Sequence, residues 1–135
     1  MKDDAFGIKV WALSAGYIPL KSNGKEPDFV SQDKMAVLNT GREDAHLKLT
    51  IYFSDGETAG TYELTVQGQR VRAFRVNDLI FPHAIPLGVA YGCIIESDVP
   101  VVVQFTKLYS TQDDLALMGT TAYGHTENDN GKRRG

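Results

Sequence analysis

Hydrophobic and polar residues alternate along several short stretches of the chain. Between residues 47 and 53 every odd position is apolar and every even position carries Lys, Thr or Tyr. Between Tyr62 and Val66, apolar residues likewise alternate with Glu63 and Thr65. A period of two is typical of a strand with one buried face. We therefore predict two half-buried strands here.

Further strands are predicted at residues 8–13, 28–31, 35–39, 70–76, 91–97 and 99–108, with Asp98 as the turn between the last two. The glycine-centred link at Gly68 predicts that its two flanking strands continue an antiparallel meander. Thr111 as N-cap and Gly119 as stop predict one or two helical turns over residues 111–119. The fold class predicted is all-β, an antiparallel β-sandwich or open barrel, with at most this short helix near the C-terminus.

Two stretches depart from simple alternation. In residues 70–76 the apolar positions change face, which indicates either a β-bulge or a strand that meets protein on both faces. Residues 101–103 are three consecutive valines. They fit a central strand covered twice or, our preferred interpretation, a strand in a subunit interface.

Length and charge limit the classes of function. The 135 residues suit one domain, predicted as residues 1–126, and the polar residues 127–135 are predicted to be a disordered tail. With a net charge of -3, the chain lacks the excess positive charge that general nucleic-acid binding requires. Cys93, the single cysteine, lies in an apolar run and is predicted to be buried. With no apolar leader and no run of membrane-spanning length, we expect a soluble, cytoplasmic protein.

The densest group of titratable residues is the loop from Arg42 to His46. Glu43, Asp44 and His46 are metal-ligand types, but their spacing matches no ligand signature, so a polar turn is favoured over a metal site. Loop carboxylates and the histidines likewise form no catalytic motif. We expect no enzyme activity, no cofactor and no metal.

Two sets of residues suggest binding instead. Arg70, Arg72 and Arg75 with Lys107 form a candidate basic stripe for phosphate or carboxylate groups, although strand-face pairing with Glu57 or Glu63 is the simpler interpretation. Aromatic residues suit stacking on sugar rings, although most are expected in the core or an interface. These aromatic residues are Trp11, Tyr17, Tyr52, Tyr62 and Tyr91.

Blocks of sequence between Trp11 and Tyr123 resemble, in order and spacing, the soluble sensory rhodopsin transducer family. The blocks are Gly16-Tyr17-Ile18-Pro19, Gly24-x-Glu26-Pro27-x-Phe29, Leu38-Asn39-x-Gly41-x-Glu43-Asp44-Ala45-His46, Thr50-Ile51-Tyr52-x-Ser54-Asp55, Tyr62-x-Leu64-Thr65-Val66, Arg75-x-Asn77-Asp78-Leu79, Val99-Pro100-x-Val102-Val103-Gln104 and Ala122-Tyr123.

This resemblance implies a small cytoplasmic β-sandwich that assembles as a homotetramer and docks to the cytoplasmic face of a membrane photoreceptor, a microbial rhodopsin that binds retinal. It implies signal relay without enzyme activity. It leaves open a carbohydrate or other small ligand, as in similar sugar-binding sandwiches, and the less favoured alternative of a DNA-binding regulator.

The chain also departs from the family pattern. Phe105, Lys107, Tyr109 and Thr111 stand where the family motif has histidine, arginine, aspartate and arginine, and Ala73 stands where a histidine is frequent. Lysine does not replace arginine at a bidentate site, so partner surfaces transfer less well than the fold. The candidates for ligand or partner binding are Trp11, Glu26, Asn39, Glu43, Asp44, His46, Tyr52, Asp55, Arg70, Arg75, Asn77, Asp78, Gln104 and Lys107.

Overall fold

Antiparallel strands make up most of the molecule. The computed structural model describes residues 5–19, 32–80, 82–111 and 114–126. The elements are β1 (Ile8–Gly16), β2 (Gln32–Asn39), β3 (Ala45–Phe53), β4 (Thr58–Val66), β5 (Arg70–Arg75), the 3-10 helix η1 (Val76–Asp78), β6 (Tyr91–Thr111), β7 (Asp114–Thr121) and β8 (Tyr123–His125). The predicted all-β class is confirmed. The predicted strand at 28–31 and the tail at 127–135 lie outside the described residues.

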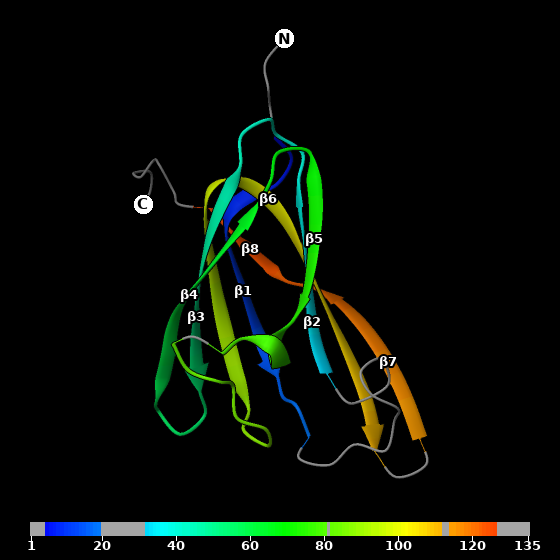
Figure 1. Ribbon diagram of the computed structural model, residues 1–135. Coiled ribbons are helices and arrows are strands. Elements are labelled where there is room, and N and C mark those ends of the chain that lie inside the picture. The colour runs from blue at the N-terminus through cyan, green and yellow to red at the C-terminus, as the bar shows by residue number, and fades with distance from the viewer. Residues whose placement is uncertain (1–4, 20–31, 81, 112–113, 127–135) are drawn as a thin grey trace, which may run out of the picture.

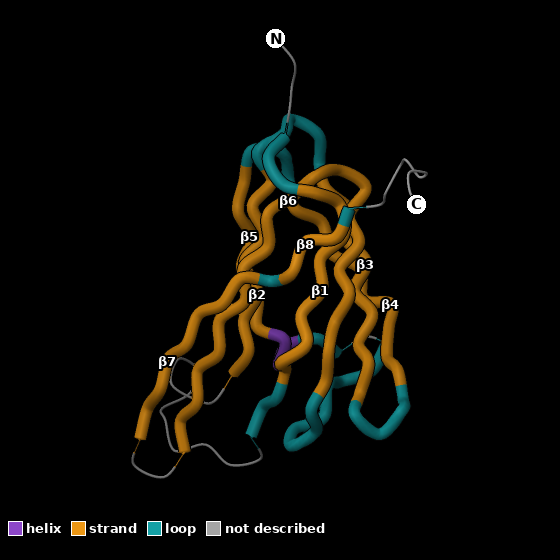
Figure 2. Tube along the Cα trace, turned by 180° about the vertical axis from the view of Figure 1, so that it is seen from behind, coloured by secondary structure: helices purple, strands orange, loops and turns teal. Residues whose placement is uncertain are grey.

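Strand β6 connects the two layers of the sandwich. Its first part pairs with β1 and β3, in a sheet ordered β4-β3-β6-β1-β8, which we call sheet A. Its second part lies between β2 and β7, and β5 pairs with β2 at the edge of this second layer, sheet B. In Figure 1 the ribbon of β6 rises in one layer, arches over and descends in the other. Figure 2 shows the same two layers from behind. The predicted antiparallel β-sandwich is therefore confirmed.

The core lies between the sheets and follows the alternation of the sequence. Leu47, Leu49 and Ile51 of β3 are at most 1% exposed, and the even positions of β3 face outward. Tyr62 and Val66 of β4 are also buried. Because full burial of such a side chain contributes about 1.5–3 kcal/mol, this inward face is a main source of stability. Among the described residues, no helix is long and apolar enough to cross a membrane.

Two predictions near the C-terminus were wrong. The strand does not end at Asp98, since β6 continues through it while changing from sheet A to sheet B. The predicted helix over residues 111–119 is replaced by strand where the structure describes it, because Thr111 ends β6 and Asp114–Thr121 forms strand β7 along the edge of β6. Pairing with a neighbouring strand outweighed the local capping signals, as tertiary context commonly does.

The predicted meander is also only half right. Strand β4 pairs with β3, as expected, but β5 pairs with β2 and belongs to the other sheet. The turn between β4 and β5 carries the chain across, with Gln69 in a left-handed conformation at φ 57°. The meander therefore ends at this turn.

Neither explanation offered for the irregular pattern in β5 holds within the single chain. The ladder of β5 with β2 runs without a bulge from Arg70 to Arg75. Residues 70–73 are exposed, and Val71 is 63% exposed, so the two faces of the strand are not both covered. In β6, Val101 and Val103 are buried and Val102, between them, is half-buried on the outer face of sheet B.

Candidate functional site

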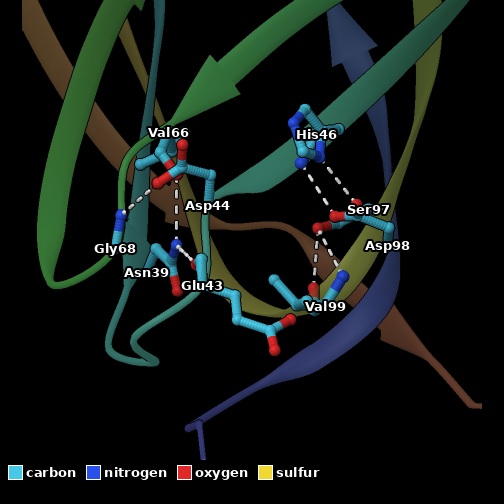
Figure 3. Close-up of polar contacts among 9 residues, drawn as sticks. All are labelled: Asn39, Glu43, Asp44, His46, Val66, Gly68, Ser97, Asp98 and Val99. Atoms are coloured by element: carbon cyan, nitrogen blue, oxygen red, sulfur yellow. Dashed lines mark hydrogen bonds and ion pairs between the residues drawn. The ribbon is translucent and has the colours of Figure 1, made fainter.

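The turn between β2 and β3 is held by one buried amide (Figure 3). Asn39 is 0% exposed, and its Nδ2 donates to the carbonyl oxygens of Glu43 at 2.8 Å, Val66 at 3.1 Å and Gln67 at 3.3 Å. Its Oδ1 accepts from Gly41 N at 3.0 Å. These bonds fix the turn against the end of β4, so Asn39 determines how the neighbouring side chains are presented.

A second set of contacts joins this turn to the turn between β4 and β5. Asp44 Oδ1 accepts from Gly68 N at 3.1 Å, and Gln69 N donates to Gly41 O at 2.9 Å. A Cβ on Gly68 would lie 2.1 Å from Arg42 O, so only glycine allows this approach. The carboxylate of Asp44 therefore has a structural partner, while both Glu43 and Asp44 remain exposed.

His46, at the start of β3, forms a pair with Asp98 in β6 (Figure 3). His46 Nδ1 lies 2.7 Å from Asp98 Oδ2, and His46 N donates to Asp98 Oδ1 at 2.8 Å. The two side chains are 65% and 52% exposed. The hydrogen bond and charge of Asp98 raise the pKa of His46, and the hydrogen bond from the His46 backbone N–H leads the lowering of the Asp98 pKa. The result is an accessible imidazole ring whose Nδ1 is already engaged by Asp98.

The other end of β3 lies on an aromatic part of sheet A. Tyr52 and Tyr123 are 49% and 67% exposed and both border a shallow depression of about 650 Å³. Small or apolar residues also line it, among them Gly92, Ile94 and Ala12. Tyr52 pairs with Gly92 in the ladder and Ala12 with Tyr123, which places the tyrosines on the two flanks. Such a surface suits stacking on a flat ligand.

A buried acid–base pair lies between the two sheets. Lys107 Nζ in β6 is 3.1 Å from Asp33 Oδ1 in β2, with side-chain exposures of 11% and 0%. The ammonium also donates to Ala15 O in β1 at 2.8 Å and to Tyr17 O, just after β1, at 3.4 Å. The Asp33 carboxylate and two backbone carbonyls at the end of β1 thus compensate the charge of Lys107.

The carboxylate of Asp33 is equally well satisfied. Its Oδ2 accepts from Tyr91 Oη at 2.6 Å and from Tyr17 N at 3.0 Å, and its backbone N–H donates to Asn77 Oδ1 at 3.2 Å. Sequence reasoning named Lys107 and Asn77 but missed Asp33 and placed Tyr91 only among the aromatics. The alternation of inward and outward positions along β2 could have identified Asp33, because Asp33 falls on an inward position.

The three arginines of β5 do not form one stripe. Arg70 and Arg72 share a face of the strand, and Arg75 lies on the opposite face. Arg75 pairs with Asp78 at 2.7 Å, and Arg72 Nη1 donates to Thr65 O at 2.9 Å. Arg70 Nη1 lies within reach of the carbonyls of the two preceding residues. DNA binding through this strand stays a prediction, which the salt dependence of binding would test.

The remaining candidates lie apart from one another. Trp11 is 8% exposed, and its Nε1 donates to Val101 O at 3.0 Å, so it belongs to the core. Asp55 accepts from the backbone of its own turn, and Gln104 is exposed on sheet B. Glu26 lies outside the described residues.

The candidates therefore do not meet at one place. Asn39, Glu43, Asp44 and His46 gather at one end of β3, and Tyr52 and Asp55 lie at its other end, roughly 20–30 Å away for a strand of this length. In the described part of the chain, no three His, Cys, Asp or Glu side chains come together as a metal site.

Comparisons with known proteins agree with the fold. The family model described as Anabaena sensory rhodopsin transducer matches residues 6–124. The solved Anabaena sensory rhodopsin transducer is 46% identical, with a TM-score of 0.69 over 75% of this chain and 97% of that one. A structure described as Thermotoga maritima 1070 is 30% identical, with a TM-score of 0.74 over 89% of this chain and 97% of that one. No curated protein matches. The chain belongs to the Anabaena sensory rhodopsin transducer family.

Proposed function

We propose that this chain is a cytoplasmic, non-enzymatic interaction module that relays a signal from a membrane photoreceptor or related receptor and works as a homotetramer. The observation that carries the proposal is the family match, which extends over nearly all the described residues. The relative that is 46% identical is named as a sensory rhodopsin transducer. The polar network around Lys107 and Asp33 is buried and cannot contact a partner. The geometry therefore favours a module that binds through its exposed surfaces.

The outer face of sheet B supports an assembly surface. Leu38 of β2 pairs with Val71 of β5 on one side and with Val102 of β6 on the other. These three side chains form an apolar row, with Leu38 40% and Val71 63% exposed and Val102 half-buried. The row reaches β5, an edge strand, and exposed apolar edges favour association between chains.

Light scattering coupled to size exclusion tests the assembly. The wild type is expected to elute as a tetramer, and Val71→Glu is expected to shift it to smaller species because the charge would be desolvated at the interface. Ile80→Glu is the matched control, since Ile80 is 59% exposed and lies after η1, away from the row. A monomeric wild type, or equal effects of the two variants, would contradict this assembly surface.

Co-purification tests the receptor. A tagged copy of the chain, expressed in its own cells, is expected to retain a retinal-binding membrane protein, detected by its visible absorption. A source genome without any microbial rhodopsin would contradict the photoreceptor and leave the fold and assembly untouched.

The depression flanked by Tyr52 and Tyr123 favours a second candidate function, the binding of a carbohydrate or other small flat ligand. A thermal-shift screen with millimolar sugars is the test, because a ligand that binds the folded state raises its melting temperature. A hit is expected to disappear in Tyr52→Ala and Tyr123→Ala. No hit in the screen would count against this function.

A further inference from the structure

A second depression, of about 380 Å³, lies where β3 and β4 of sheet A meet a side chain from sheet B. Its lining includes His46 and Lys48 of β3, Glu63 and Thr65 of β4, and Arg72 of β5. In the ladder His46 is opposite Thr65 and Lys48 is opposite Glu63, so these four side chains share the outer face of sheet A.

The position of Arg72 is set by both sheets. Strand β5 pairs with β2 in sheet B, yet Arg72 Nη1 donates to Thr65 O of β4 at 2.9 Å. Because a guanidinium carries five N–H donors in a planar fork, this bond leaves most of them for a ligand. Arg72 therefore reaches the depression from the opposite sheet with its plane already anchored.

Positive charge gathers here in a chain whose net charge is -3. Lys48 and Arg72 are both charged at neutral pH, and Glu63 is the one carboxylate in the lining. Among the described residues, no ion pair links Lys48 or Arg72 to a carboxylate. His46 adds a third cation when protonated, and its partner Asp98 offsets part of that charge.

We infer that this depression binds a small molecule that carries a phosphate group. The free donors of Arg72 and the ammonium of Lys48 would hold the phosphate oxygens, and the Thr65 hydroxyl lies beside them. Glu63 would accept a hydrogen bond from a hydroxyl on the rest of the molecule. The volume of the depression suits a small ligand. An extended polyanion is disfavoured, because it would bring a second phosphate close to the negative charge of Glu63.

The test is an NMR titration with inorganic phosphate at constant ionic strength, using sodium chloride to balance the salt. Saturable shifts are expected at the amides of Lys48, Thr65 and Arg72. Arg72→Gln is expected to weaken the affinity by about tenfold or more, since a charge-assisted bond is lost. Arg70→Gln is the matched control, on the same face of the same strand but bonded to its own turn, and is expected to leave affinity unchanged.

A second variant separates binding from folding. Arg72→Lys keeps the charge and loses the planar fork, so its affinity is expected to fall between the wild type and Arg72→Gln, with melting temperatures recorded for all three proteins. Absence of saturation, or equal losses in Arg72→Gln and Arg70→Gln, would overturn the site. Binding to phosphatidylglycerol vesicles without binding to inorganic phosphate would overturn it also. The result is independent of the assembly test, which concerns the outer face of sheet B.

Discussion

Two acid–base pairs of this molecule have similar chemistry and opposite surroundings. The pair of Lys107 and Asp33 lies between the sheets, with Asp33 fully buried, and the pair of His46 and Asp98 lies on the surface at the end of β3. The surface pair is the shorter of the two, at 2.7 Å against 3.1 Å. Distance alone therefore does not show which pair matters more for stability.

The difference lies in what surrounds each pair. Removing one partner of a buried pair leaves a charge that water cannot reach, whereas an exposed pair exchanges its bond for water at little cost. The buried pair joins the side chains of β2 and β6 and also contacts the backbone carbonyl of Ala15 in β1. We conclude that the buried pair holds the sheets together and that the surface pair is available for binding.

The largest effect is expected from Asp33→Ala. Without the carboxylate, the buried ammonium of Lys107 loses its ion pair with Asp33, and the free energy of unfolding is expected to fall by about 3–5 kcal/mol in urea denaturation. The double variant Asp33→Ala with Lys107→Met should recover part of this loss. A loss below about 1 kcal/mol in Asp33→Ala would put the pair in the class of surface ion pairs and remove the contrast.

An intermediate effect is expected from Asn39→Ala in the turn that precedes His46. The buried carbonyls that its amide now serves would lose a donor, so unfolding in urea should become easier by about 1–3 kcal/mol. Asp44→Ala provides the control, since Asp44 is exposed and bonds to a single turn amide. Equal losses in the two variants would mean that burial of the amide does not matter here.

The smallest effect on stability is expected from Asp98→Asn. Loss of the carboxylate should lower the pKa of His46 toward its ordinary value of 6.5, measured by NMR titration of the imidazole, with little change in the urea midpoint. Because the pKa of His46 is raised in the folded protein, its contribution is complete below 6.5 and is lost as the pH rises through the raised value. An unchanged pKa of His46 would show that the pair does not form in solution.

The alternation of inward and outward positions along the strands explains which buried residues could be predicted from the sequence and which were missed. The alternation in residues 47–53 predicted β3 and its buried face correctly. The same period places Asp33 with Met35 and Val37, and Lys107 with Phe105, on inward positions. Sequence reasoning treated Lys107 as a surface ligand because it judged the polar residue by its charge and not by its position in the alternation.

Site geometry was less accessible to prediction than the strands were. The block from Asn39 to Asp55 is continuous in sequence, but a strand of nine residues separates its two ends. The depression that contains Arg72 depends on β5 joining the opposite sheet, and the link at Gly68 had predicted the reverse. A short connection limits where the next strand begins and does not decide which neighbour it pairs with.

The sequence by itself determined the all-β class, the inward faces of β3 and β4, the burial of Cys93 and the family, since each depends on local periodicity or on matching blocks of residues. Only the tertiary structure decided that β6 serves both sheets and that β7 is a strand. It also decided that Lys107 meets Asp33, 74 residues away. Pairings of this kind depend on which backbone groups and charges are satisfied together, and no short stretch of sequence contains both partners.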